Sequence, residues 1–111
     1  MEKDNKIFLE HILESINFIE KYINGLNKND FFNSMEKQDA IIRRLEIIGE
    51  VAMNLSDNFK NTASHIPWRD IADFRNVLIH EYFGIKEDLV WEVIKKDMPE
   101  LKKEIKILLK L

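Results

Sequence analysis

Apolar residues recur along the first part of this chain at intervals of three and four, the period of a helix with one buried face. The first such stretch runs from about residue 5 to 26. Its stripe consists of Phe8, Ile12, Ile16, Ile19, Ile23 and Leu26. Gly25 and the polar run 27–30 are expected to end it, because Gly and Asn accept turn conformations. The pattern predicts a long amphipathic helix.

A second helix is predicted to begin near Asn33, because Asn33 and Glu36 have the spacing of a capping box. Its inner face is expected to consist of Ala40, Ile41, Leu45, Ile48, Ala52 and Leu55. The helix is expected to fray at residues 56–58. Together the first two helices are predicted to pair as an antiparallel hairpin.

Residues 61–66 are loop-like, and Pro67 suits the first turn of a third helix, where its missing N–H costs nothing. This helix is expected to run from Trp68 to about Glu81 and to be closed by Gly84. A short fourth helix is predicted over residues 86–96.

A further helix is predicted to start at Asp97, with Asp97 as its cap and Glu100 reaching back. No repeat or linker interrupts the plan. The predicted fold class is therefore all-α, a four- to five-helix up-and-down bundle, with residues 1–111 forming a single helical domain.

The composition agrees with the predicted helices and indicates the kind of compartment to expect. The chain of 111 residues is 33% charged and has only 3 Gly and 2 Pro, which favours long helices. Cysteine is absent, which fits a reducing compartment, and no apolar run approaches the roughly 20 residues of a membrane span. We therefore expect a cytoplasmic protein without membrane attachment.

Charge is unevenly distributed along the chain. The net charge is −3, which argues against a broad nucleic-acid footprint, and no DNA binding is expected. Residues 95–111 nevertheless carry +3, from six Lys against three acidic residues, so residues 1–94 carry −6. We interpret these lysines as a solvated helix face, with a track for phosphates as the alternative.

The third predicted helix carries the candidate chemistry. Its buried stripe is expected to consist of Ile71, Phe74, Val77 and Leu78. Asn76 and His80 are four residues apart and share the opposite face, whereas Arg75 lies on its flank, about 140° around the helix from His80. For Arg75 and His80 to reach one phosphate, the Arg side chain must wrap round, the helix must loosen, or a second subunit must complete the site.

These residue types are the ones that metal-free RNA cleavage requires. The imidazole of His80 can exchange a proton near neutral pH, and the guanidinium of Arg75 can hold two phosphate oxygens at once. Asn76 can orient either group without adding charge. On spacing alone, however, an Arg and a His five residues apart on a helix most often have structural roles.

A resemblance to a known family changes this balance. Residues 67–82 closely resemble the signature region of HepT-like HEPN proteins: Arg, a polar residue, three variable residues, His, one variable residue, Tyr. Every fixed position is matched, by Arg75, Asn76, His80 and Tyr82. The likeness extends to residues 44–50, 90–91 and 97–101, and thus spans most of the chain.

One departure from the family pattern is visible just before the motif. Relatives often have Gly-Met there, whereas this chain has Asp73 and Phe74. The substitution introduces an acidic group one turn before Asn76. It is expected to affect packing or substrate approach without removing a catalytic atom.

The resemblance implies an all-α bundle of HEPN type that acts as a homodimer and cleaves RNA. It implies a metal-independent endoribonuclease without cofactor, the toxin of a toxin–antitoxin pair, whose site lies at the dimer interface. His80 is the implied general acid or base, Arg75 the clamp on the scissile phosphate, and Asn76 a supporting residue. The implied partner is a nucleotidyltransferase antitoxin that modifies Tyr82 with AMP.

Other interpretations remain open at this stage. The chain could be a catalytically silent helical dimer that binds a nucleotide or a nucleotidyltransferase and keeps the motif for interaction. Tyr82 could simply anchor the end of its helix. A magnesium site at Asp70 and Asp73, with Glu81 beside His80, is conceivable but weakly supported, because the chain has no HExxH motif and no pair of His four apart.

The remaining polar and aromatic candidates have simpler explanations. His11 is expected to be packed or partly exposed, and His65 to be solvated or to contact substrate from its loop. Trp68 and Trp91 are expected in the core or an interface, with RNA stacking as the alternative. We expect Arg43, Arg44, Glu46 and Glu50 to form ion pairs within or between helices. The alternative is that they have a supporting role around the cleft lined by the motif residues.

Overall fold

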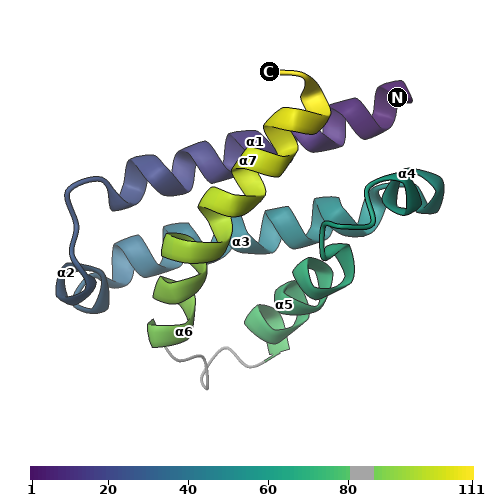
Figure 1. Ribbon diagram of the computed structural model, residues 1–111. Helices are drawn as coiled ribbons and strands as arrows, with labels where there is room; N and C mark the ends of the chain where they lie inside the picture. The colour runs from purple at the N-terminus through teal and green to yellow at the C-terminus, as the bar shows by residue number, and fades with distance from the viewer. Residues whose placement is uncertain (81–86) are drawn as a thin grey trace.

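Two long antiparallel helices, α1 (Lys3–Ile23) and α3 (Met35–Asn54), form one side of the molecule (Figure 1). The computed structural model describes residues 1–80 and 87–111, and every regular element in them is a helix. Their interface is made of fully or almost fully buried side chains: Leu9, Ile12, Ile16 and Ile19 of α1, and Ile41, Leu45, Ile48 and Ala52 of α3. The predicted hairpin and all-α class are thereby confirmed.

The connection between α1 and α3 contains a short helix that the sequence did not predict. Gly25 has a φ of +79° and ends the first helix as expected. Asn27 then caps α2 (Lys28–Phe32) in a capping box with Asp30. The next helix begins near Asn33 as predicted, but Asn33 is the C-cap of α2 and does not cap the new helix. Ser34 is the N-cap instead, and its hydroxyl accepts a hydrogen bond from the Lys37 N–H at 3.2 Å.

Beyond α3 the chain starts a helix where fraying was expected. Ser56 caps α4 (Asp57–Thr62) by accepting a hydrogen bond from the Phe59 N–H at 3.2 Å. The same serine exchanges two hydrogen bonds of 3.1 Å with the buried side chain of Asn5. This pair ties the start of α1 to the far end of α3.

The start of α5 (Trp68–His80) is held by a buried aromatic residue. Trp68 donates its indole N–H to the Ala63 carbonyl at 3.1 Å and packs on Phe59, with ring centroids 6.2 Å apart. The Pro67 carbonyl accepts the Ile71 N–H at 3.0 Å, so Pro67 stands just before the helix, close to its expected place. Trp68 is 6% exposed, which supports the core role over base stacking.

The C-terminal helices run on without the predicted break. Helix α6 (Glu87–Glu92) continues through a π-helical segment, η1 (Val93–Asp97), into α7 (Met98–Leu109). Asp97 has helical dihedral angles and makes no side-chain cap, so the restart predicted there is wrong. The reason is Pro99, which lacks an N–H and crowds an α-helical turn. The wider π turn, with the Met98 N–H bonded to the Val93 carbonyl, accommodates it.

These last elements complete the bundle. Helix α7 packs on α1, and α6 packs on α2, where the rings of Phe31 and Trp91 lie 5.4 Å apart. The buried residues of this continuous helix are Val90, Ile94, Met98, Leu101 and Ile105. In the described parts of the chain, no helix combines the length and apolarity needed to cross a membrane.

Helix α5 turns a different stripe toward α3 than the one predicted. Ile71, Phe74 and Leu78 are buried or partly buried as expected, but Val77 is 38% exposed. The fourth inward position is occupied by Arg75, which with Ile71, Phe74 and Leu78 has the i, i+3, i+4, i+7 spacing of one helix face. The prediction that Arg75 lies on the flank of the polar face is therefore wrong.

A glycine on α3 makes room for this arginine. A Cβ built at Gly49 would overlap the Cβ of Arg75, and would lie 3.1 Å from its Cγ and 3.2 Å from the Ile71 carbonyl oxygen. The Ile71 carbonyl is part of the backbone, and the Cβ and Cγ of Arg75 are the atoms of its side chain nearest the backbone. None of these atoms can move aside unless α5 itself moves. The two helices therefore approach as closely as they do because residue 49 has no side chain.

Gly49→Ala is expected to destabilise the protein by about 1–3 kcal/mol, the usual cost of forcing a methyl group into a packed contact. At an unconstrained position inside a helix the same change stabilises by about 0.5–1 kcal/mol, so the two cases differ in sign. Urea unfolding followed by circular dichroism measures the difference. An increase in stability would show that α3 and α5 are not in close contact here.

Candidate active site

Arg75 is the motif residue whose surroundings are best defined. Its side chain is 28% exposed, with the stem against Gly49 and the guanidinium at the edge of the α3–α5 contact. Nη1 donates to Asn76 Oδ1 at 3.1 Å, and Nη2 lies 3.7 Å from Glu50 Oε1. The Nε atom is buried and has no hydrogen-bond partner within the described residues. The guanidinium is thus half-buried and already in contact with two side chains.

The outward face of α5 carries the other motif positions. Asp73, Asn76 and Val77 are exposed, and His80 follows at the next position of the same face, in the last turn of the helix. Helix α5 stays helical through His80, so the loosening considered from the sequence does not occur up to that residue. Tyr82 lies outside the described residues, as does the side chain of His80.

A series of ion pairs on α3 reaches the Arg75 guanidinium through Glu50. Glu50 Oε1 lies 3.7 Å from Arg75 Nη2 and also 3.7 Å from Arg43 Nη1. Arg43 in turn lies 3.7 Å from Glu46 Oε1. The expected ion pairs therefore form for Arg43, Glu46 and Glu50, and one of them reaches the motif. Arg44 instead lies 4.3 Å from the centroid of the Phe18 ring. Sequence reasoning grouped Glu50 with the other α3 charges, but nothing in the spacing showed that it would meet Arg75.

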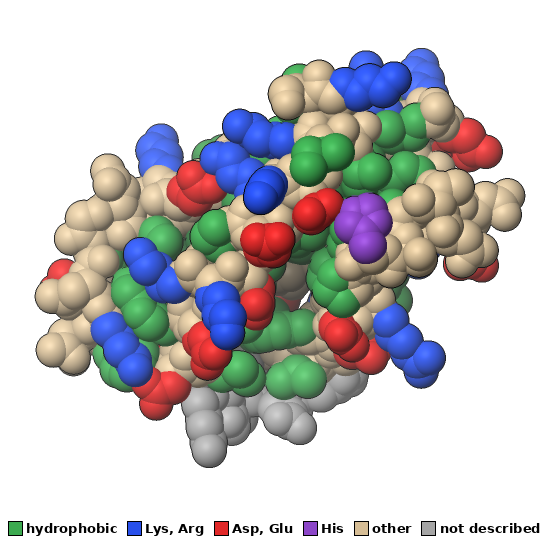
Figure 2. Space-filling model, viewed as in Figure 1, with side chains coloured by type: hydrophobic (Ala, Val, Ile, Leu, Met, Phe, Trp, Pro, Cys, Tyr) green, Lys and Arg blue, Asp and Glu red, His purple; other side chains and the backbone are tan. Residues whose placement is uncertain are grey.

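A groove of about 370 Å³ opens between α5 and the η1–α7 segment. Its floor is apolar, with Leu45, Ile48, Ile71, Phe74, Met98 and Leu101 among its lining residues. Four carboxylates line it, those of Asp70, Asp97, Glu100 and Glu104, and Figure 2 shows acidic side chains gathered around this hollow. Such a lining repels phosphates, so an RNA backbone is not expected to bind in this groove.

His65 lies at this groove in an ion-pairing position. Its Nε2 is 2.9 Å from Glu104 Oε2, which links the loop before α5 to α7. Its side chain is 60% exposed, so it is solvated as expected and also contacts Glu104. His11 is exposed on α1, which leaves it without a structural partner among the described residues and without an assigned role.

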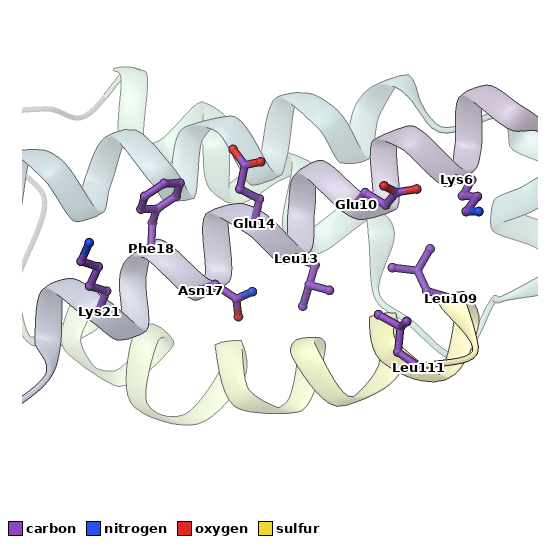
Figure 3. Close-up of a pocket in the computed structure, with 9 residues that line it drawn as sticks. All are labelled: Lys6, Glu10, Leu13, Glu14, Asn17, Phe18, Lys21, Leu109 and Leu111. Carbon is purple, nitrogen blue, oxygen red and sulfur yellow. The ribbon is translucent and has the colours of Figure 1, made fainter.

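A second depression, of about 700 Å³, lies between α1 and the end of α7 (Figure 3). Lys6 and Lys21 border it with positive charges and Glu10 and Glu14 with negative ones, and Leu13, Phe18, Leu109 and Leu111 supply its apolar surface. None of the described motif residues lines it. Its mixed charges give no preference for an anionic or a cationic ligand, so it is not a candidate site.

The C-terminal lysines are spread along η1 and α7. Figure 1 shows the end of α7 beside the start of α1, away from the end of α5. Lys102 pairs with Glu20 of α1 at 2.9 Å, and the Lys95 ammonium lies 5.6 Å from the Trp91 ring centroid. These contacts favour the solvated helix face over a continuous track for phosphates. They also place Trp91 in a packed aromatic cluster.

The acidic residues near the motif are dispersed. Asp73 lies 4.0 Å from Arg69, one turn earlier on α5, so a local positive charge partly offsets the acidic departure from the family pattern. Asp70 lines the acidic groove. In residues 1–80 and 87–111 no three His, Asp or Glu side chains are close enough to hold a metal ion together.

Comparison with known proteins places the chain in a family. The model of the family described as "Ribonuclease HepT-like" matches residues 12–108. A Methanocaldococcus jannaschii protein named "Gamma-glutamylcyclotransferase and putative RNase" is 53% identical over 105 residues, which cover 95% of this chain and 47% of that protein. This chain thus spans about half the length of that relative.

Two further relatives are matched over nearly their whole length. A "Putative RNase" of the same organism is 40% identical over 106 residues, covering 96% of this chain and 97% of the relative. A "Probable ribonuclease HepT" of Thermococcus cleftensis is 41% identical over 102 residues, covering 92% and 93%. No solved structure matches the chain with significance. The family match and these identities show that the chain belongs to the ribonuclease HepT-like family.

Proposed function

We propose that this protein is a metal-independent endoribonuclease in which Arg75 holds the scissile phosphate and His80 exchanges the proton. The observation that carries the proposal is the half-buried Arg75 guanidinium, in contact with Asn76 inside a complete family motif. Relatives named as ribonucleases support the coarser statement, an RNase activity. The nucleophile, the metal independence and the roles of single residues are our inference.

The chemistry needs no group beyond these side chains and the RNA. The 2′-hydroxyl of the substrate attacks the adjacent phosphorus, and its proton is taken by a neutral imidazole. The imidazolium formed in this way donates its proton to the leaving 5′-oxygen, and the product carries a 2′,3′-cyclic phosphate. Arg75 contacts the non-bridging oxygens and stabilises the charge that grows on them in the transition state. Asn76 holds the guanidinium through its Oδ1.

The geometry of α5 favours a site shared by two chains. The stem of Arg75 is turned toward α3, whereas position 80 belongs to the outward face with Asn76 and Val77. Val77 is an apolar side chain exposed on that face, and Ile79 and Leu89 are exposed nearby in sequence. Burying these residues against a second copy would bring Arg75 of one chain toward His80 of the other.

The same proposal includes control by a partner. We assign the protein as the toxin of a toxin–antitoxin pair, with a nucleotidyltransferase that transfers AMP from ATP to the phenolic oxygen of Tyr82. That oxygen would attack the α-phosphorus, lose its proton and release pyrophosphate. The bound AMP adds negative charge and bulk two residues from His80, which would repel the RNA backbone.

Purified protein is expected to cleave RNA in the presence of EDTA and to leave 2′,3′-cyclic phosphate ends. His80→Ala and Arg75→Ala should each lower the cleavage rate by about 100-fold or more, because each removes a group that acts in the transition state. His65→Ala is the matched control, since His65 is bonded to Glu104 outside the motif. Its cleavage rate should stay within twofold of the wild type, by gel assay of a labelled RNA.

Cleavage that stops with EDTA would contradict the metal-free mechanism. Full activity of His80→Ala would contradict the proton-transfer role. An inactive wild type that still binds RNA or a nucleotidyltransferase would favour the alternative of a silent binding protein.

Mixed dimers test whether the site is shared. Arg75→Ala and His80→Ala chains, carrying different affinity tags, are co-expressed and the mixed dimer is purified. If Arg75 and His80 of opposite chains act together, one of two sites is intact and about half of the wild-type rate returns. Mixed dimers as inactive as either parent would show that each site uses residues of one chain.

Co-expression with a nucleotidyltransferase from the same genomic neighbourhood tests the proposed control. Mass spectrometry is expected to find an added AMP mass on the peptide containing Tyr82, together with loss of RNA cleavage and relief of growth arrest. Tyr82→Phe should remain unmodified and active under the same conditions. Modification of Tyr22 instead, or none, would contradict this part of the proposal.

A further inference from the structure

The carboxylate of Glu50 lies between two guanidinium groups. Its Oε1 atom is 3.7 Å from Arg75 Nη2 and 3.7 Å from Arg43 Nη1, so the two nitrogens cannot be farther apart than twice that distance. Arg75 is a motif residue on α5, whereas Arg43 and Glu50 belong to α3. Glu50 therefore connects the α3 surface to the proposed phosphate clamp.

This contact is poorly suited to stabilising the fold. The Glu50 side chain is 38% exposed, that of Arg75 28%, and 3.7 Å is too long for a hydrogen bond. Ion pairs of this kind contribute little to the free energy of unfolding, because solvent screens them. The packing of α5 on α3 rests instead on Gly49 and the apolar stripe. An effect of Glu50 on Arg75 is thus separable from an effect on folding.

The tip of Arg75 is the part that needs orientation. Its stem is fixed against Gly49, but the guanidinium emerges at the edge of the helix contact and can swing about its last torsions. Asn76 Oδ1 accepts from Nη1 at 3.1 Å, and Glu50 attracts Nη2 from the opposite helix. Nη1 then keeps one N–H for a phosphate and Nη2 keeps both of its own, which is enough for a bidentate contact.

We propose that Glu50 is a positioning residue that holds the guanidinium of Arg75 in the orientation that clamps the scissile phosphate. This inference rests on the proposed ribonuclease function. Glu50 does not contact the RNA; it acts through Arg75. Arg43 lies 3.7 Å from the same oxygen, on the other side of the carboxylate.

The proposal predicts different effects on kcat and on RNA affinity. A carboxylate beside the clamp lowers the local positive charge, so it weakens attraction for RNA in the ground state. At the same time it restricts the orientations of the Arg75 guanidinium, and the transition state requires one particular orientation. Loss of the carboxylate should therefore lower kcat while leaving RNA binding as tight or tighter. A purely structural role would impair both together.

Glu50→Gln is the test, since it keeps the shape of the side chain and removes its charge. The expected kcat is about 10- to 100-fold lower, the range found when a catalytic group is misplaced. RNA affinity, measured with His80→Ala added to prevent cleavage, should be unchanged or about two- to fivefold tighter, the size of an exposed charge effect. Glu50→Asp, which keeps the charge, should recover part of kcat.

Glu46→Gln is the matched control. Glu46 lies one turn earlier on α3 and contacts Arg43 at the same 3.7 Å, but within the described residues it forms no ion pair with Arg75. Its kcat should stay within twofold of the wild type. A Glu50→Gln protein with wild-type kcat, or one whose kcat and affinity fall together with its thermal stability, would overturn the inference.

Side-chain NMR gives a readout that does not depend on cleavage. Nitrogen-15 relaxation of the Arg75 side chain should show an ordered guanidinium in the wild type and in Glu46→Gln, and a mobile one in Glu50→Gln. If the wild type cuts no RNA but this difference appears, the ribonuclease proposal fails and the positioning role stands. Equal order in all three proteins would overturn the positioning role, whatever the activity.

Discussion

The close contact of α3 and α5 at Gly49 is the constraint on which the site depends. It brings the stem of an arginine onto the face of α5 that apolar side chains otherwise fill. The aliphatic part of the side chain gains burial there, while the guanidinium reaches the edge of the contact. The buried Nε, which has no partner in the described chain, is a cost of this arrangement. A residue needed only for packing would not carry that cost.

This contact also explains which parts of the fold the sequence could predict. The helix period identified α1, α3 and their hairpin, because the stripe residues there are uniformly apolar. On α5 the same reasoning chose Val77 over Arg75, since it sorts residues by polarity. Only a partner without a side chain, Gly49, makes room for Arg75, and pairing across two helices is not visible in a local pattern. The packing of α5 against α3 therefore determined which residues of α5 face inward.

Smaller errors have equally local causes. Asn33 and Ser34 are both good caps, and the outcome depended on Asn33 already ending α2. Asp97 looked like a helix start because Glu100 follows it at capping-box spacing, but the chain passes through a π turn there within a continuous helix. The motif residues themselves were found by family resemblance, since spacing alone supported only a structural role. The contact of Glu50 with Arg75 required the register of α5 on α3, which only the fold supplies.

Charge then constrains how such a protein can act on RNA. The chain has a net charge of −3, carboxylates line the groove between α5 and α7, and the C-terminal end of α7 lies away from the end of α5. Attraction for RNA must therefore come from a few charges near Arg75, reduced further by Glu50. Under the proposed function, this weak electrostatic attraction for RNA makes the protein easy to inactivate by one modification. A nuclease with a broad basic surface would still bind RNA after one anionic modification. When only a few charges attract the backbone, a single phosphodiester added beside the motif is enough to reverse the local sign.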